Sequence, residues 1–249
     1  VDVNAVLLEL LLQELPDLLA PRQSRRHSMR DVQFVNAGRR EQAPGESTEE
    51  QCGQRVQPDA GGVEGACLRR REPRPEPEQR VVASDSGHFC GWVPRFLRVP
   101  DARSSCLSHS FQSVGLGLAS AIGLGLANPG ALSVLGVGDG GFLMSISDLE
   151  TAIRMKMRMC ILVYNDASYA AEVHLYRRHG LSVDIVQFPD TDFAAIARGH
   201  GARVTTVRAV ADLDPVRAWV AEGAPGVFVI DAKINPDLEA DWHLEHFQV

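Results

Sequence analysis

The sequence predicts an α/β domain with a doubly wound parallel sheet flanked by helices, preceded by a poorly ordered N-terminal extension. From residue 80 onward, short apolar runs rich in β-branched residues recur without polar alternation, as expected of strands buried on both faces. Helical stretches separate these runs, and helical crossovers connect parallel strands. Residues 1–79 differ, because they hold one aromatic residue, Phe34, and mixed runs of Arg, Glu and Pro that bury too little apolar surface to offset chain entropy.

The chain therefore divides into three predicted parts. The extension covers residues 1–79 and contains one stretch with the pattern of an amphipathic helix, Leu7–Leu19. The folded domain is predicted over residues 80–235, and residues 236–249 form a tail.

The elements of the domain follow from the alternation of strand and helix patterns. Six strands are predicted, at Val81–Ser84, Ser105–Leu107, Leu132–Val137, Cys160–Tyr164, Arg203–Val207 and Gly226–Asp231. Five helices are predicted between them, at Val114–Ala127, Ser147–Lys156, Tyr169–His179, Asp192–His200 and Ala211–Glu222. Ser147 and Asp192 are candidate N-caps, because short polar side chains accept hydrogen bonds from the first turn of a helix.

Composition excludes several classes of protein. The net charge of −7 argues against nucleic-acid binding, which needs an excess of Lys and Arg. No apolar run reaches the roughly 18 residues of a membrane-spanning helix. The five cysteines are odd in number and lack Cys-x-x-Cys spacing, which argues against a zinc site or a disulfide framework and favours reduced thiols in the cytoplasm.

The chemistry is expected in the loops that follow two neighbouring strands, because ligands of doubly wound sheets bind at the carboxyl ends of the strands. Residues 136–141 match the Gly-x-Gly-x-x-Gly pattern of a dinucleotide site. However, Asp139 lies inside this loop, where its carboxylate would repel a diphosphate unless a cation stood between them. Asp166 follows the next strand, and two carboxylates at adjacent strand ends can share a Mg²⁺ ion that also binds phosphate oxygens. The sequence favours this metal-bridged diphosphate, and a dinucleotide-binding oxidoreductase remains the alternative.

Several motifs in this region occur in the same order in a known family. These motifs are the glycine-rich segment 114–123, the segment Gly138–Ala152 that begins Gly-Asp-Gly, and the pair Asn165-Asp166. Together they make residues 81–234 resemble the pyrophosphate-binding domain of thiamine diphosphate-dependent enzymes of the acetolactate synthase and 2-oxo acid decarboxylase type.

The resemblance assigns a set of metal and cofactor contacts. It implies that Mg²⁺ is bound by the Asp139 side chain, by Asp166 and by the main-chain carbonyl of Ser168. Asp166 departs from the family, which has the second Asn of an Asn-Asn pair there. Contacts to thiamine diphosphate are implied for His88, Gln112, Val114, Gly138, Gly140 and Gly141. His88 could instead be a hydrogen-bonded structural residue, and Val114 stands where a larger apolar residue normally supports the bent cofactor.

The segment that follows the metal motif resembles the Tyr-x-x-Glu segment of pyruvate and indolepyruvate decarboxylases, with Tyr169 and Glu172 as its matching residues. By that resemblance Glu172 is the catalytic residue, an acid/base near the reacting carbon. The alternative is that Glu172 faces solvent on an amphipathic helix.

The resemblance implies decarboxylation or carboligation of a 2-oxo acid. It also implies a separate pyrimidine-binding domain, usually from another subunit, which residues 1–79 do not resemble. We therefore expect a catalytically incomplete chain that forms a homo-oligomer or a complex with such a domain. Two alternatives are the dinucleotide-binding oxidoreductase, which would not need Mg²⁺ for cofactor binding, and a non-catalytic relic of the thiamine diphosphate fold.

Overall fold

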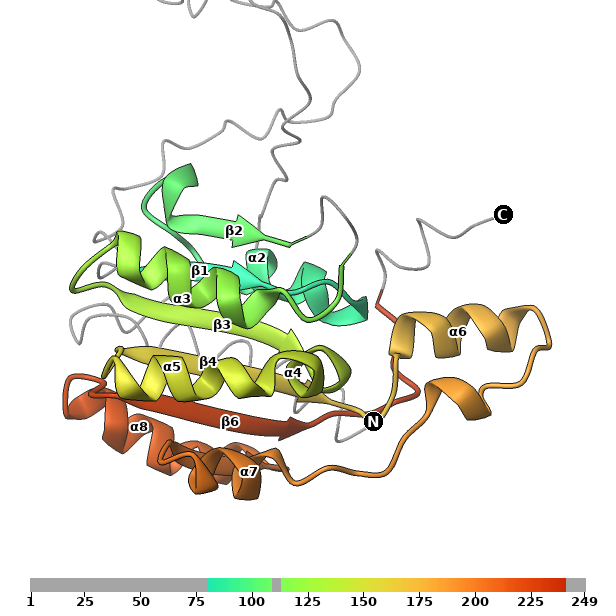
Figure 1. Cartoon of the computed structure of the whole chain (residues 1–249). Coiled ribbons are helices and arrows are strands. Elements are labelled where there is room, and N and C mark those ends of the chain that lie inside the picture. Colours follow the sequence, from blue (N-terminus) through green and yellow to red (C-terminus); the bar gives the residue numbers. More distant parts are fainter. Residues whose placement is uncertain (1–79, 109–112, 241–249) are drawn as a thin grey trace, which may run out of the picture. The chain divides into compact units, whose positions relative to one another are not determined.

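The computed structural model describes residues 80–108 and 113–240, and these residues form a parallel six-stranded sheet with helices on both faces (Figure 1). The strand order is β2-β1-β3-β4-β6-β5. The strands are β1 (Arg80–Ser84), β2 (Ser105–Leu107), β3 (Leu132–Gly138), β4 (Met159–Asn165), β5 (Arg203–Val207) and β6 (Val227–Lys233). All six predicted strands and the predicted fold class are confirmed. The expected helix over Leu7–Leu19, the residue Gln112 and most of the tail lie outside the described residues.

The order in which strands are added to the sheet changes side at β1. From β1 the chain moves to β2 on one side, and α3 (Gly117–Ala127) then returns it to β3 on the other side of β1. All neighbouring strands pair in parallel, so their carboxyl ends lie along one edge of the sheet. This change of side creates the crevice in which doubly wound folds bind their ligands.

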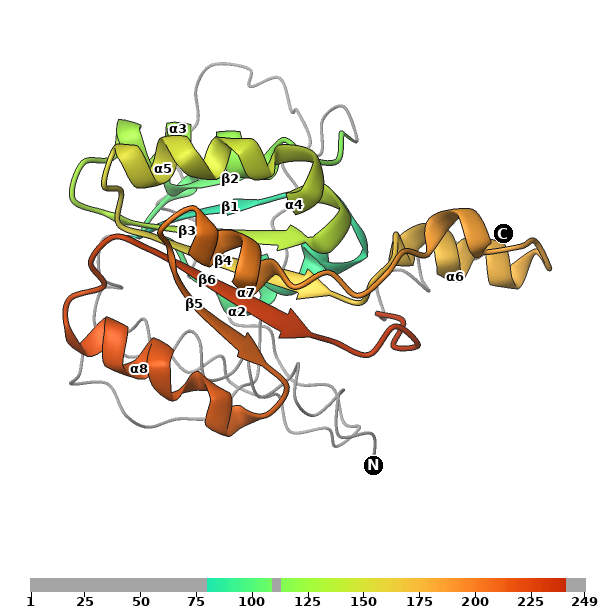
Figure 2. The ribbon, with the colours of Figure 1, turned by 60° about the horizontal axis from the view of Figure 1, so that its bottom comes forward.

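Helices cover the two faces of the sheet and one end of it. The face covered by α3 also holds α4 (Asp139–Ser145), α5 (Leu149–Arg154) and α7 (Phe193–Gly199). The other face holds α2 (Trp92–Phe96) and α8 (Asp214–Ala221) (Figure 2). Helix α6 (Ala170–Arg178) lies beyond the carboxyl ends of the strands and covers neither face (Figures 1 and 2). Short 3-10 turns complete the chain at His88–Gly91, Ala102–Ser104, Ile146–Asp148, Asp184–Val186 and Val210–Leu213.

Large side chains fill both interfaces between helices and sheet. On the α8 face, the Trp219 ring of the helix packs against Phe228 of β6, with ring centroids 5.1 Å apart. On the opposite face, Phe142 of α4 packs against Phe193 of α7 at 5.5 Å. Burial of such aromatic side chains contributes roughly 1.5–3 kcal/mol each, so both layers stabilise the sheet that carries the site.

Several helix boundaries differ from the prediction, among them the start of α8 at Asp214 after the 3-10 turn Val210–Leu213. Helix α3 begins at Gly117 because Gly115 has a φ of +94° in the turn before it. The segment after β3, expected as a loop, starts α4 at Asp139. The predicted N-cap Ser147 is wrong, because it lies in a 3-10 turn and Asp148 precedes α5. The N-cap Asp192 is confirmed: its carboxylate accepts a hydrogen bond from the Ala195 N–H at 2.8 Å.

The described part of the chain contains no helix of the length and apolar character needed to cross a membrane.

The Asp192 cap gives a prediction about stability. Asp192→Ala should lower the free energy of unfolding by about 1 kcal/mol, because it removes the acceptor for an N–H at the start of α7. Chemical denaturation measures the change. Asp148→Ala is the matched control, since Asp148 precedes α5 without a capping side-chain hydrogen bond. Equal losses in the two variants would contradict the assignment.

Candidate functional site

A buried carboxylate begins the turn after β3. Asp139 is 2% exposed and is the first residue of α4. Its Oδ1 accepts a hydrogen bond from the Gly140 N–H at 2.7 Å, and its Oδ2 accepts one from the Ala167 N–H at 2.7 Å. Because Ala167 follows β4, this side chain joins the ends of two neighbouring strands.

The loop after β4 brings the other predicted metal ligands to the same place. The Asp166 Oδ1 accepts hydrogen bonds from the N–H and the hydroxyl of Ser168, at 3.1 and 3.0 Å. Ala167 between them has a φ of +57°, which is uncommon for a residue with a side chain. The far side of the loop is fixed by the Phe188 N–H, which donates to the Ala167 carbonyl at 3.0 Å.

The two carboxyl groups have perturbed pKa values. Burial raises the pKa of Asp139 to about 6, although main-chain N–H groups oppose the shift. Burial, followed by the nearby charge of Asp139, raises the pKa of Asp166 to about 7. Both shifts reflect negative charge that a cation would stabilise. Within residues 80–108 and 113–240, no three His, Cys, Asp or Glu side chains cluster as a complete metal site. A cation here would need other oxygen ligands as well.

The glycines of the turn are closely approached by neighbouring side chains, so a Cβ would not fit at either position. A Cβ on Gly140 would lie 2.3 Å from Cε1 of the Tyr169 ring, and one on Gly141 would lie 2.4 Å from Oδ2 of Asp85. The same Gly141 position lies 3.2 Å from Cγ1 of Val114. The structure therefore brings Val114 close to the glycine turn.

Asp85 is a site residue that the sequence analysis missed. It follows β1, is fully buried, and accepts hydrogen bonds from the Ser86 N–H, the Ser108 hydroxyl and the Gly115 N–H, at 2.9, 2.9 and 2.8 Å. These bonds tie the ends of β1 and β2 to the turn before α3. Its position directly after a predicted strand, at the edge where ligands bind, is the signal that could have identified it.

His88 and Glu172 occupy different surroundings. The Nε2 atom of His88 accepts a hydrogen bond from the Ala240 N–H at 2.9 Å, and its ring lies 4.9 Å from the ring of His174 on α6. Phe89, beside His88, has its ring against Gly138, where a Cβ would lie 2.9 Å from Cε1. Glu172 is exposed in the first turn of α6, beyond the carboxyl ends of the strands.

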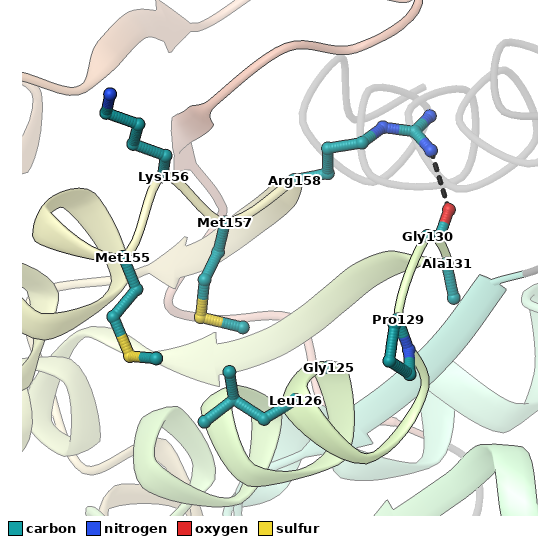
Figure 3. Close-up of a pocket in the computed structure, with 9 residues that line it drawn as sticks. All are labelled: Gly125, Leu126, Pro129, Gly130, Ala131, Met155, Lys156, Met157 and Arg158. Carbon is teal, nitrogen blue, oxygen red and sulfur yellow. Dashed lines mark hydrogen bonds between the residues drawn. The ribbon is translucent and has the colours of Figure 1, made fainter.

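A hollow of about 280 Å³ at the opposite edge of the sheet has different chemistry (Figure 3). Met155, Met157 and Leu126 point toward one another there, and Lys156 extends away from them (Figure 3). Arg158 donates to the Gly130 carbonyl at 2.8 Å. No carboxylate lines this hollow, so it does not fit a hard cation.

The crevice residues fit a divalent cation that bridges to a diphosphate. Two carboxylates at adjacent strand ends provide hard oxygen ligands, and main-chain N–H groups of a glycine turn at the same edge are the kind of donors that bind phosphate oxygens. The fold and this site define an α/β domain with two carboxyl groups and a glycine turn at the carboxyl edge of its sheet.

Comparison with known proteins identifies the family. The chain belongs to the thiamine pyrophosphate enzymes, because residues 85–232 match the family model described as "Thiamine pyrophosphate enzyme, C-terminal TPP binding domain". It contains the C-terminal thiamine pyrophosphate-binding domain of that family. The comparisons give no support to the dinucleotide-binding alternative.

Two curated relatives are acetolactate synthases. The catabolic enzyme of Raoultella terrigena is 33% identical over 167 residues, which cover 66% of this chain and 30% of the relative. The enzyme of Bacillus subtilis is 31% identical over 156 residues, covering 62% and 27%. The chain thus spans less than a third of the length of these relatives.

A solved structure supports the fold. Benzoylformate decarboxylase from Polynucleobacter necessarius matches with a TM-score of 0.58 at 18% identity, over 66% of this chain and 32% of that one.

The raised pKa values predict how pH affects the cation-free protein. Carboxyl groups of an unfolded chain titrate near pH 4, whereas those of Asp139 and Asp166 titrate at about 6 and about 7 in the fold. The folded state therefore holds these protons more tightly. Their contribution to stability is complete below about pH 4 and is lost as the pH rises through about 7.

Asp166→Asn should make this decline shallower, since the amide does not titrate. Denaturation in buffer with a chelator, between pH 4 and 8, measures the effect on wild type and variant. Identical pH profiles would contradict the shifted pKa of Asp166.

Proposed function

We propose that this chain binds thiamine diphosphate through Mg²⁺ and forms part of an enzyme that decarboxylates or ligates a 2-oxo acid. The observation that carries the proposal is the buried Asp139 carboxylate, which joins the glycine turn to the loop of Asp166. A carboxylate placed within a turn that binds diphosphate is favourable only when a cation separates the two negative groups.

The chain's own residues would share the binding of the cofactor. Asp139, Asp166 and the Ser168 carbonyl would hold Mg²⁺, with diphosphate oxygens and water completing its shell. The diphosphate would lie against the glycine turn, and Val114, in the turn before α3, would support the cofactor. Further contacts are proposed for His88, Gln112, Gly138, Gly140 and Gly141.

When bound, thiamine diphosphate supplies an electron sink at the carbonyl carbon of the substrate. Glu172 is the proposed acid/base of this chain. Its exposed position at the start of α6, past the strand ends, leaves the carboxylate accessible to a substrate on that side. A positioned acid/base of this kind typically contributes about 10²–10⁴-fold in rate.

A partner domain is part of the proposal. Leu116, Leu143 and Met144 are 47%, 41% and 57% exposed beside the glycine turn, and Met144 lies 2.9 Å from where a Cβ on Gly115 would be. Exposed apolar groups at a site mark surfaces that another protein covers. We propose that a pyrimidine-binding domain of another subunit covers this face.

The proposed compartment is the cytoplasm. Three cysteines of the described residues, Cys90, Cys106 and Cys160, are free thiols. Free thiols are typical of reducing compartments.

Asp139→Ala tests the cation-bridged site. We expect it to abolish Mg²⁺-dependent binding of thiamine diphosphate, measured by isothermal titration calorimetry, because the side chain that links both strand ends is lost. Circular dichroism checks that the variant remains folded. Unchanged affinity would contradict the proposal.

Asp166→Asn serves as the matched variant at the other ligand. It keeps a coordinating oxygen at the same reach and restores the residue usual in the family, so binding should be retained. A loss as large as that of Asp139→Ala would show that the second charge is required.

The need for a partner domain predicts that this chain alone does not activate its cofactor. Asp139 and Asp166 would be committed to the metal, and Glu172 lies on the substrate side. We therefore expect the thiazolium proton of thiamine diphosphate to exchange with deuterium at the rate of free cofactor, as followed by NMR with Mg²⁺ and the chain as sole protein. Much faster exchange would overturn the incomplete-enzyme proposal.

A further inference from the structure

A buried polar network lies beside the proposed cation site, at the carboxyl ends of β4 and β6. The Nδ2 group of Asn165, the last residue of β4, donates to Oδ1 of Asp231 at 2.8 Å and to the Thr191 carbonyl at 3.1 Å. Asn165 is 3% exposed and Asp231 is fully buried. Both N–H bonds of the amide are therefore used within the protein.

The charge of Asp231 is balanced from the other side. The Nζ of Lys233, two residues along β6, forms an ion pair with Oδ2 of Asp231 at 3.1 Å, and it donates a hydrogen bond to the Thr191 carbonyl at 2.9 Å. Lys233 further pairs with Asp190. A buried carboxylate with a cationic partner and a hydrogen-bond donor is a fixed acceptor, because leaving any member unpaired is costly.

The network and the cation site meet at consecutive residues. Asn165 is bonded toward β6, whereas Asp166 accepts from Ser168 in the loop beside Asp139. The Asn165 carbonyl also accepts from the Ile234 N–H at 3.0 Å. Side chain and main chain of Asn165 are therefore both held by neighbouring segments at the point where the ligand loop begins.

The opposite end of the loop is held separately. The Tyr169 N–H donates to the Val186 carbonyl at 2.9 Å, and the Phe188 N–H donates to Ala167. Only the first end therefore depends on the side chain of Asn165.

We propose that Asp231 is a positioning residue for the cation site: through Asn165 it sets where the loop carrying Asp166 and Ser168 leaves the sheet. This inference rests on the proposed function. It gives the two residues of the pair different roles: Asn165 anchors the loop to β6, and Asp166 is the proposed metal ligand. Outer residues that orient metal ligands typically change metal affinity by about 10- to 100-fold when mutated.

Exchanging the amide and the carboxylate between positions 165 and 231 tests their contact directly. Asn165→Asp places two carboxylates opposite each other, and Asp231→Asn places an amide against both Lys233 and Asn165. Each should raise the Mg²⁺ concentration for half-saturation, at saturating thiamine diphosphate, by about 10-fold or more. The double variant recreates one amide facing one carboxylate and should recover part of the loss, since paired residues show non-additive effects.

Ser133→Ala controls for a loss of stability alone. The buried Ser133 hydroxyl donates to the Ala121 carbonyl at 2.9 Å, at the amino end of β3 and away from the site. This variant should be destabilised without a change in half-saturation by Mg²⁺. If Asp231→Asn does not fold, Lys233→Gln replaces it, because that change removes the balancing charge from a side chain that is 12% exposed. A smaller rise in half-saturation is then expected.

Amide exchange in the cofactor-free chain separates this inference from the proposed function. The Ala167 N–H, bonded to Asp139, should exchange faster in both single variants and more slowly again in the double variant. Absence of Mg²⁺-dependent binding in the wild type would refute the proposed function, and the exchange rates would still decide the role of Asp231. The inference would be overturned if the Ala167 N–H of the single variants exchanged at the wild-type rate and their half-saturation by Mg²⁺ were unchanged.

Discussion

Burial of carboxylates at the ends of parallel strands is the constraint on which the site depends. The buried Asp85 and Asp139 follow β1 and β3, the half-buried Asp166 follows β4, and parallel pairing places these strand ends on one edge of the sheet. A buried carboxylate is tolerated when donors surround it. Here the donors are mostly main-chain N–H groups of the neighbouring turns, so satisfying each charge also fixes the path of the adjacent chain.

The same constraint explains the glycines. The main chain at Gly141 lies against Asp85, and the main chain at Gly140 lies against the ring of Tyr169, so neither position accommodates a methyl group without movement. Glycine here results from how closely the three strand ends approach one another. The close packing that excludes side chains at these two positions therefore also sets the path of the turn that would face a ligand.

The strands and the order of the motifs could be predicted from the sequence, because buried parallel strands and glycine turns leave local patterns. The position of Asp139 and Asp166 at the carboxyl edge of the sheet could also be predicted, since each directly follows such a strand. The role proposed for Asp231 could not, because it depends on a hydrogen bond to Asn165 across 66 positions of sequence. The start of α4 at Asp139 was likewise missed, because Gly140 and Gly141 are poor helix formers that tertiary contacts hold in place.

The hydrogen bond from the Ala167 N–H to Asp139 affects the kinetics of ligand binding. It closes the β3 turn onto the β4 loop in the protein itself, with Ala167 already in its left-handed conformation. The entropy of ordering these segments is therefore lost during folding, and little of it has to be lost during association. Ligand entry should then depend on diffusion and on the exchange of water around the cation, with no slow folding step of the loop.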